Sequence, residues 1–161
     1  MTNRLWIAAA YHSAFLCGGW GYVRGQGDGQ AGGQRNTTAQ TMTLTSLLAA
    51  LKDLPAGHVH IHTSDAAFAR LVGKIATGQP LLEKEAPTDN LPLWAQLTTA
   101  LKRHPPTFTL SQPTGFPGDP AAFAQAWADL AMDKAKAAGP FTAAIPKPNL
   151  AKLKLGGASH V

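Results

Sequence analysis

Three histidines of this chain share a pattern that could bind a metal. His58, His60 and His62 alternate with Val59 and Ile61. Alternation at period two predicts a β-strand with the three imidazoles on one face, where they could offer ligands to zinc or nickel. Same-face positions on a strand are roughly 7 Å apart, too far for three rings to converge comfortably on one tetrahedral ion without other ligands. Polar packing at a sheet surface is therefore the favoured interpretation.

Lysines gather toward the C-terminal end, at positions 134, 136, 147, 152 and 154, with Asp133 as the acidic residue among them. Lys134 and Lys136 fall in a predicted helix, and the others in a segment of prolines, lysines and small residues. A flexible basic arm would attract nucleic-acid phosphates in a salt-dependent way. A solubilising tail or a segment that docks on a partner would have the same composition, so the three interpretations stay open.

The spacing of apolar residues predicts the elements that position these side chains. Apolar runs predict strands over 5–10 and 18–23, and the glycine-rich stretch 25–36 predicts a turn. Leucines at helical spacing predict a helix over 44–54, with threonines before it as N-cap candidates. Further along, a strand is predicted over 58–63, helices over 66–75 and 93–101, a short strand over 108–110, and an alanine-rich helix from 123 to near Gly139.

This order of elements indicates an α/β domain over residues 1–139, followed by an extended or mobile basic tail over 140–161. A length of 161 residues fits one domain, and a hydrophobic content of 45% argues against disorder throughout. The net charge of +5 favours acidic partners such as nucleic acid. A single cysteine, Cys17, and an N-terminus without a signal-peptide pattern predict a cytoplasmic protein, and no apolar run is long enough to predict a membrane span.

Four short motifs, in order along residues 5–138, resemble those of type 1 ribonuclease H. The segment 37–44, Thr-Thr-Ala-Gln-Thr-Met-Thr-Leu, is similar to the family's entry into its first helix. The other three are Thr63-Ser64-Asp65 with Phe68, Asn90-Leu91-Pro92-Leu93-Trp94, and Ala128-Asp129 with Ala131. The resemblance implies a ribonuclease H-like fold, with a mixed five-stranded sheet flanked by helices.

The resemblance also implies which carboxylates would be catalytic. An active enzyme of this family holds two divalent metals with four carboxylates, because the paired cations must be neutralised by oxygen ligands before they can activate water. Asp65 and Asp129 match the third and fourth of these positions. They are the candidate catalytic and metal-binding residues, with His12 as a further candidate ligand. Mg²⁺ or Mn²⁺ would be weakly bound here, or no cofactor bound at all.

The first two carboxylates have no counterpart. Residues 1–27 and 29–52 contain no Asp or Glu, and Asp28 falls in the glycine-rich turn. His12 or one of Ala8–Ala10 stands at the first position, and Thr43 at the second. The family's late loop also lacks its histidine, because residues 111–120 contain none. These departures predict that ordinary ribonuclease H catalysis is lost.

Candidate nucleic-acid contacts follow from the same resemblance. Thr38 and Gln40 stand where members of the family touch the nucleic-acid backbone and minor groove, although a threonine before a helix also serves as a simple N-cap. Trp94 would contact nucleic acid only if lysines surrounded it, and a packed core tryptophan is an equal alternative. Lys134 and Lys136 are added as candidate contacts because of the basic cluster described above and not because of the resemblance.

Three functions remain open from the sequence. The first is a ribonuclease H-like protein that binds RNA–DNA hybrid or structured nucleic acid without cutting it efficiently. The second is an active metal-dependent endoribonuclease with an altered site. The third is a non-catalytic interaction scaffold, for example in a homo-oligomer.

Overall fold

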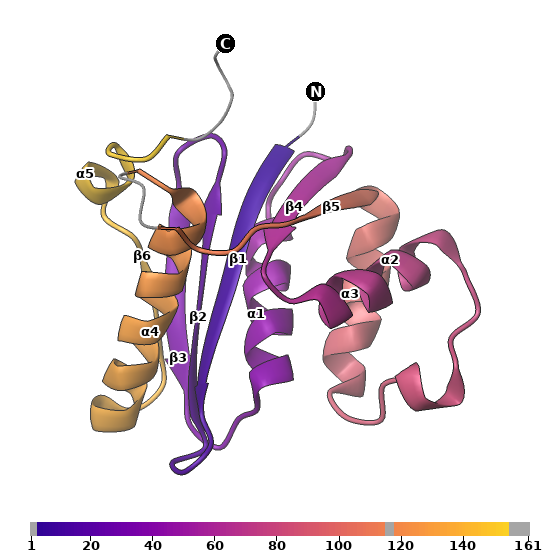
Figure 1. Cartoon of the computed structure of the whole chain (residues 1–161), viewed down its shortest axis with the longest axis horizontal. Helices are drawn as coiled ribbons and strands as arrows, with labels where there is room; N and C mark the ends of the chain where they lie inside the picture. The colour runs from indigo at the N-terminus through magenta and orange to yellow at the C-terminus, as the bar shows by residue number, and fades with distance from the viewer. Residues whose placement is uncertain (1–2, 115–117, 155–161) are drawn as a thin grey trace.

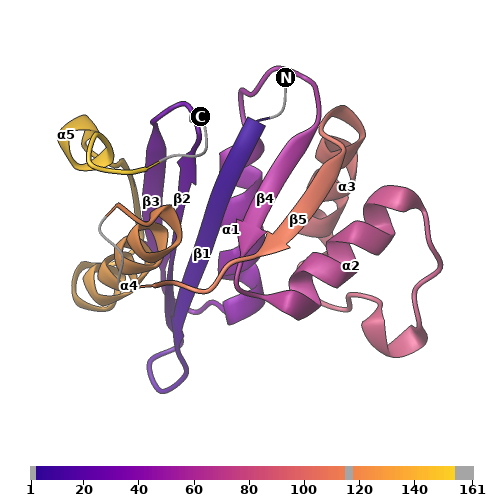
Figure 2. The ribbon, with the colours of Figure 1, turned by 45° about the horizontal axis from the view of Figure 1, so that its top comes forward.

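The computed structural model describes residues 3–114 and 118–154. Within them, a mixed sheet has six strands in the order β5-β4-β1-β2-β3-β6 (Figures 1 and 2). The strands are β1 (Asn3–His12), β2 (Cys17–Arg24), β3 (Gly29–Gln34), β4 (Val59–Thr63), β5 (Pro106–Leu110) and β6 (Phe141–Ala144). Strands β1, β2 and β3 form an antiparallel meander, and β4 and β5 run parallel to β1.

Helices cover both faces of this sheet. On one face lie α1 (Ala39–Leu51), α2 (Ala66–Thr77) and α3 (Leu91–Arg103), and on the other lie α4 (Pro120–Ala138) and the short α5 (Lys147–Leu150) (Figure 1). A 3-10 helix, η1 (Glu83–Glu85), lies between α2 and α3. Among the described residues, no helix has the length and apolar character to cross a membrane.

Each face of the sheet has its own hydrophobic core. Leu5 and Ile61 point toward α1, α2 and α3, where Met42 and Leu97 are fully buried. Trp6, on the opposite face of β1, belongs to the second core, whose members come from the meander, α4 and the segment after it: Val23, Ala31, Ala124, Ala131, Ile145 and Leu150. The alternation of side chains along β1 therefore serves both layers.

Strand β3 corrects the turn predicted over 25–36. The glycines that suggested a turn are needed in the strand because α4 approaches it closely. A Cβ atom on Gly33 would lie 2.5 Å from the carbonyl oxygen of Ala131. Close backbone approach is one of the few reasons for glycine inside a strand. The tight turn itself is shorter and contains Asp28, which forms an ion pair with Arg24 at 2.8 Å.

The segment after Gly139 also differs from the expected extended tail. Phe141–Ala144 forms β6, which pairs antiparallel with β3 and raises the strand count from the expected five to six. Ile145 and Leu150 are buried against the α4 side of the sheet. The sequence shows little sign of this strand because it is short, two of its residues are alanines, which are depleted in strands, and prolines lie just before and after it. The end of the expected tail, 155–161, lies outside the described residues.

Candidate functional site

A small cavity of about 170 Å³ lies between the second half of β1, the start of α1 and the end of β4. Its lining comprises Ile7 to Tyr11, Ala39, Thr43 and the segment Thr63 to Asp65. We call it the alanine cavity. It joins β1, α1 and the end of β4, the elements from which the resemblance draws the first three carboxylates. Asp65 is the only acidic residue in its lining.

The Asp65 carboxylate is engaged in local structure. Asp65 is the N-cap of α2, and its Oδ1 accepts a hydrogen bond from Phe68 N at 3.0 Å. Its own backbone N–H donates to Thr63 Oγ1 at 3.1 Å. An aspartate in this role stabilises a helix without any metal, because it satisfies a backbone donor that the helix leaves free. The side chain is nevertheless exposed at the mouth of the cavity.

Thr43 occupies the α1 position where the resemblance places the second carboxylate. Its hydroxyl donates to Ala39 O at 3.2 Å, and the residue is buried. A hydroxyl turned back onto its own helix supplies no negative charge to the cavity. The β1 side is equally apolar, since it presents Ala8, Ala9 and Ala10.

Asp129 lies on the exposed side of α4 and does not line the alanine cavity. Gln125, one turn earlier, connects it to β1: the Gln125 Nε2 amide donates to Asp129 Oδ1 at 3.2 Å and to Ala9 O at 3.0 Å. Sequence reasoning missed Gln125. The available signal was its i, i+4 spacing to Asp129, which places both side chains on one helix face.

His12 does not join the two aspartates. It pairs with Cys17 beside the β1–β2 hairpin, and its ring packs against Phe15 with centroids 4.9 Å apart. The last parallel pair of β1 and β4 is Trp6 with His62, six residues before His12 and three before Asp65. His12 thus extends about 10 Å farther along the sheet than Asp65.

The residues present do not fit a pair of divalent metal ions. Across residues 3–114 and 118–154, no group of three or more His, Cys, Asp or Glu side chains is placed to hold a metal. Hard cations such as Mg²⁺ take several oxygen ligands and are neutralised by carboxylates. One cavity carboxylate and a separate, glutamine-bound Asp129 do not provide that set.

The predicted nucleic-acid contacts around α1 form a hydrogen-bonded group. Thr38 is the N-cap of α1, and its Oγ1 accepts from Thr41 N at 3.1 Å. Gln40 Oε1 accepts from Asn90 Nδ2 at 3.3 Å and lies 3.5 Å from Trp94 Nε1. Thr38 and Gln40 are exposed, so both remain accessible to a ligand.

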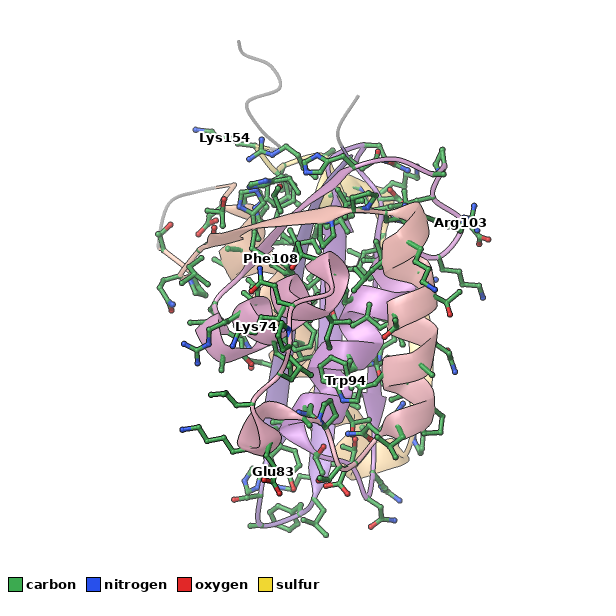
Figure 3. All side chains as sticks on the ribbon, turned by 90° about the vertical axis from the view of Figure 1, so that its right-hand side faces the viewer. Lys74, Glu83, Trp94, Arg103, Phe108 and Lys154 are labelled. Atoms are coloured by element: carbon green, nitrogen blue, oxygen red, sulfur yellow. The ribbon has the colours of Figure 1, made fainter. Side chains whose placement is uncertain are left out.

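Trp94 is a core residue, which is the second of the two alternatives that the sequence left open. It projects from α3 toward α1 (Figure 3), is only 5% exposed, and packs against Phe68 with ring centroids 6.0 Å apart. A tryptophan in this position contributes buried apolar area and one polar contact rather than a stacking platform.

Lys134 and Lys136 both lie over aromatic rings. The Nζ atom of Lys134 is 4.9 Å from the centre of the Phe141 ring, and that of Lys136 is 3.9 Å from the centre of the Phe15 ring. Phe15 is 55% exposed at the tip of the β1–β2 hairpin. Phe15 and Lys136 together present an aromatic ring and a positive charge at the molecular surface.

The histidine strand is β4, as predicted, and its imidazoles hydrogen-bond to the neighbouring strand. His60 Nδ1 and Nε2 lie 2.7 and 2.6 Å from the hydroxyls of Thr107 and Thr109 on β5. His62 Nδ1 lies 3.0 Å from Ser111 Oγ, and its Nε2 lies 3.2 Å from Arg4 Nη2. These contacts agree with polar packing at a sheet surface.

Burial and nearby cations keep these histidines neutral. Burial, followed by the charges of Arg4 and His60, lowers the pKa of His62 to about 4. The pKa of His60 is also lowered, mainly by burial and then by the positive charges of Arg4 and His58. Sequence reasoning missed Arg4, because only the parallel pairing of β1 with β4 brings it beside the histidines.

No protein-family model and no curated protein matches this chain. Solved structures do. The N-terminal RNase H domain of rv2228c from Mycobacterium tuberculosis, solved as a fusion with maltose binding protein, has a TM-score of 0.63 and 17% identity, over 84% of this chain and 96% of that one.

Two further structures agree with it. LC11-RNase H1, in complex with an RNA/DNA hybrid, gives a TM-score of 0.62 at 17% identity, over 83% of this chain and 98% of that chain. LC9-RNase H1, described as a type 1 RNase H with the type 2 active-site motif, has a TM-score of 0.60 and 17% identity, over 82% of this chain and 72% of that chain. The chain therefore has a ribonuclease H-like fold, as the sequence motifs predicted.

Proposed function

We propose that this protein binds nucleic acid, RNA–DNA hybrid in particular, across one end of its sheet and does not cut it efficiently. The contact region, which we call the hairpin surface, comprises Phe15, Thr38, Gln40, Lys136 and the mouth of the alanine cavity at Asp65. The observation that carries the proposal is the exposed Phe15 ring beneath the Lys136 ammonium. Aromatic faces stack on bases and lysines attract phosphates, so the pair suits a nucleic-acid strand.

The parts of the hairpin surface are joined by short contacts. Thr37 N donates to Leu16 O at 3.0 Å, which ties the hairpin tip to the start of α1. The exposed Arg35 donates to Ala135 O and Lys136 O, both at 2.9 Å, which fixes the end of α4 beside the same hairpin. Two cations, an aromatic ring and the polar start of α1 thus lie along one edge. The hybrid bound by LC11-RNase H1 supports the choice of ligand class.

The lack of efficient cleavage rests on the lining of the alanine cavity. Two metal ions held close together need several carboxylates to offset their mutual repulsion. The lining offers Asp65 alone, beside three alanines and a threonine whose hydroxyl faces its own helix. This set of side chains does not supply the negative charge that two neighbouring metal ions require.

A gel experiment tests both parts. Labelled RNA–DNA hybrid is mixed with excess protein at low salt, in Mg²⁺ and then in Mn²⁺, and read for shift and for cleavage. We expect a salt-sensitive shift with intact RNA. Cleavage that Asp65→Asn abolishes would overturn the non-cutting part, and absence of any shift would overturn the binding part. In the second case, a sharp dimer peak in solution would point to the scaffold alternative.

Variants of the hairpin surface localise the binding. Phe15→Ala should weaken hybrid binding by about 5-fold or more, since a stacked base contributes about 1–3 kcal/mol. Lys136→Gln should reduce the slope of log K against log salt by about 1. Lys102→Gln is the matched control, because Lys102 is an exposed lysine on α3, away from this surface. Equal effects of the two lysine variants would contradict the localisation.

Adding carboxylates tests why cutting is inefficient. Thr43→Glu combined with Ala10→Asp, and separately with Ala8→Asp, places two further acids in the lining of the alanine cavity. One of the two double variants should gain Mn²⁺-dependent cleavage over the parent while binding the hybrid equally well. If both bind hybrid and neither cuts, missing carboxylates are not the limiting defect.

A further inference from the structure

A second cavity, of about 580 Å³, lies at the beginning of β1, beside the first residues of α4. Six residues of its lining matter here: Arg4, Trp6, His62, Ser111, Asp119 and Lys154. We call it the arginine cavity. From Arg4 to His12 there are eight residues of extended strand, or about 26 Å, so Arg4 is far from the β1–β2 hairpin that carries Phe15. Lys154 lies at the end of the molecule where β1 begins (Figures 1 and 3).

Arg4 brings a positive charge to this cavity that no carboxylate balances. Among the described side chains it has no ion-pair partner, and its one hydrogen-bonding contact is His62 Nε2. The guanidinium lies over the Trp6 ring, 4.8 Å from the centroid, while His62 stacks on Trp6 at 4.7 Å. The aromatic pair therefore holds the arginine in place and leaves most of its five N–H donors unused.

The tautomer of His62 sets the role of Ser111. An arginine always donates, so His62 Nε2 must accept from Arg4. Because burial and the Arg4 charge lower the pKa of His62 to about 4, the ring is neutral at pH 7 and its single proton is on Nδ1. Nδ1–H then donates to Ser111 Oγ, and the Ser111 hydroxyl proton is left to donate elsewhere. The cavity borders that hydroxyl.

The one acid in the lining, Asp119, already has its hydrogen-bond donors. Its Oδ2 accepts from Thr114 N at 2.8 Å and Thr114 Oγ1 at 2.7 Å, and its Oδ1 accepts from Ala121 N at 3.0 Å. Burial alone would raise the pKa of Asp119, but these bonds outweigh it and hold the pKa below its usual value. Asp119 therefore acts as the cap of α4 rather than as a partner for Arg4.

We propose that the arginine cavity binds the phosphate group of a phosphate monoester of nucleotide size. Donors from three separate segments border it: the Arg4 guanidinium on β1, the Ser111 hydroxyl after β5, and the Lys154 ammonium after α5. A terminal phosphate has three acceptor oxygens and two negative charges near neutral pH, which matches three donors and two cations. The volume lies in the range of small-molecule sites.

Lys154 completes the cavity through a fixed backbone contact. Its N–H donates to Gly118 O at 2.9 Å, which ties the chain after α5 to the residues before α4. Gly118 has a φ of 80°, and a Cβ there would lie 3.1 Å from Lys154 Cγ. The lysine stem thus packs on a glycine in the left-handed region, which a larger residue would disturb.

Calorimetry on the full chain tests the proposal with adenosine, adenosine 5′-monophosphate, inorganic phosphate and a 5′-phosphorylated oligonucleotide as probes. We expect the monophosphate to bind and adenosine to fail. Stronger binding of the 5′-phosphorylated oligonucleotide than of the same oligonucleotide without its 5′-phosphate would identify a strand end as the source of the phosphate, because the hairpin surface contributes equally to the binding of both. Adenosine binding as well as its monophosphate, or no binding of any phosphate compound, would overturn the proposal.

Arg4→Gln should weaken monophosphate binding at least about 10-fold, since a hydrogen bond to a charged group contributes about 1.5–3 kcal/mol. Arg70→Gln is the matched control, because Arg70 is exposed on α2, and it should change the affinity less than about 2-fold. Lys154→Gln is a second variant in case Arg4→Gln fails to fold, because Lys154 is exposed and its replacement should not disturb the fold. Lys154→Gln should weaken monophosphate binding about 5-fold. Unchanged affinity in both Arg4→Gln and Lys154→Gln would contradict the site.

A spectroscopic readout separates ligand contact from a structural role. A phosphate beside Arg4 offsets the charge that disfavours protonation of His62, so the pKa of His62, read from its imidazole NMR signals, should rise when monophosphate is added. Phe15→Ala and Lys136→Gln should leave this response unchanged. An unmoved His62 titration at saturating ligand would place the ligand elsewhere.

Discussion

The two cavities differ in chemistry although one sheet builds both. The alanine cavity is bordered by β1, α1 and β4, and small apolar or self-bonded side chains fill the positions that could hold charge. The arginine cavity is bordered by the other half of β1, and it contains two cations, a neutral imidazole and a free hydroxyl donor. The contrast teaches that a fold fixes where backbone elements meet, whereas the side chains at each meeting point decide the chemistry.

The largest effect should come from the contact between β3 and α4, because α4 carries Lys136 of the hairpin surface and is capped by Asp119 of the arginine cavity. Gly33→Ala places a Cβ against Ala131 O and forces α4 away from the meander. We expect a loss of about 2–3 kcal/mol in the free energy of unfolding, from overpacking against backbone atoms. Hybrid binding and monophosphate binding should then weaken together on warming. Urea unfolding measures the loss.

Gly73 provides the control for that substitution. A Cβ at Gly73, inside α2, meets nothing within 4 Å, so Gly73→Ala should stabilise the protein by up to about 1 kcal/mol. Similar effects at Gly33 and Gly73 would show that α4 tolerates displacement from β3.

A smaller effect should come from the imidazole of the arginine cavity. Unfolded His62 takes up a proton below about pH 6.5, whereas the folded ring stays neutral down to about pH 4. In this window the unfolded state binds more protons, so stability falls as the pH falls. We expect a contribution of roughly 2 kcal/mol between pH 6.5 and 4, once solvent screening of the Arg4 charge is included.

The difference between the parent protein and His62→Gln isolates this contribution, because the pKa values of His60 and His104 are also lowered and both residues remain in the variant. Urea unfolding at several pH values should give a shallower dependence for the variant. Parallel curves would mean that His62 accepts a proton as readily in the folded chain as in the unfolded one.

The smallest effect should come from the alanine cavity. Asp65→Ala removes the N-cap of α2 and should cost about 1 kcal/mol, whereas Asp65→Asn, which keeps an acceptor oxygen, should cost little. Thermal melts in the presence and absence of Mn²⁺ extend the test. If Mn²⁺ raises the melting temperature of the parent protein clearly more than that of Asp65→Asn, the alanine cavity binds a cation at Asp65. The two cavities would then both bind charged ligands.

Local patterns predicted those parts of the molecule in which one segment carries its own signal. The leucines of α1, the alternation of β4 and the Asn90–Trp94 motif gave the right elements, and the order of the motifs gave the right fold. The glycines of β3 led to the wrong prediction of a turn. They allow the close approach of α4, and α4 begins 86 positions after the end of the strand, so no local pattern shows this contact. Phe141–Ala144 was predicted as part of an extended tail for a similar reason. It forms a strand by pairing with β3, which comes more than 100 residues earlier in the chain.

The candidate sites divide in the same way. Asp65 and Thr43, which the motifs matched to the third and second carboxylate positions, both line the alanine cavity, and their role there stays a prediction. For Trp94 the sequence left a surface contact and a core position open, because one chain gives no measure of burial, and the structure has it in the core. Arg4 and Gln125 were missed because their roles depend on pairing across the sheet and on a helix that returns to β1.

The way α4 covers the meander has a consequence for synthesis on the ribosome. Trp6, Val23 and Ala31 are made early, but the α4 and α5 residues that bury them begin at residue 120. Until most of the chain has emerged, the nascent meander has one face covered by α1 and the other open to water. A stall in translation before α4 would therefore leave an apolar sheet face accessible to chaperones or to neighbouring chains.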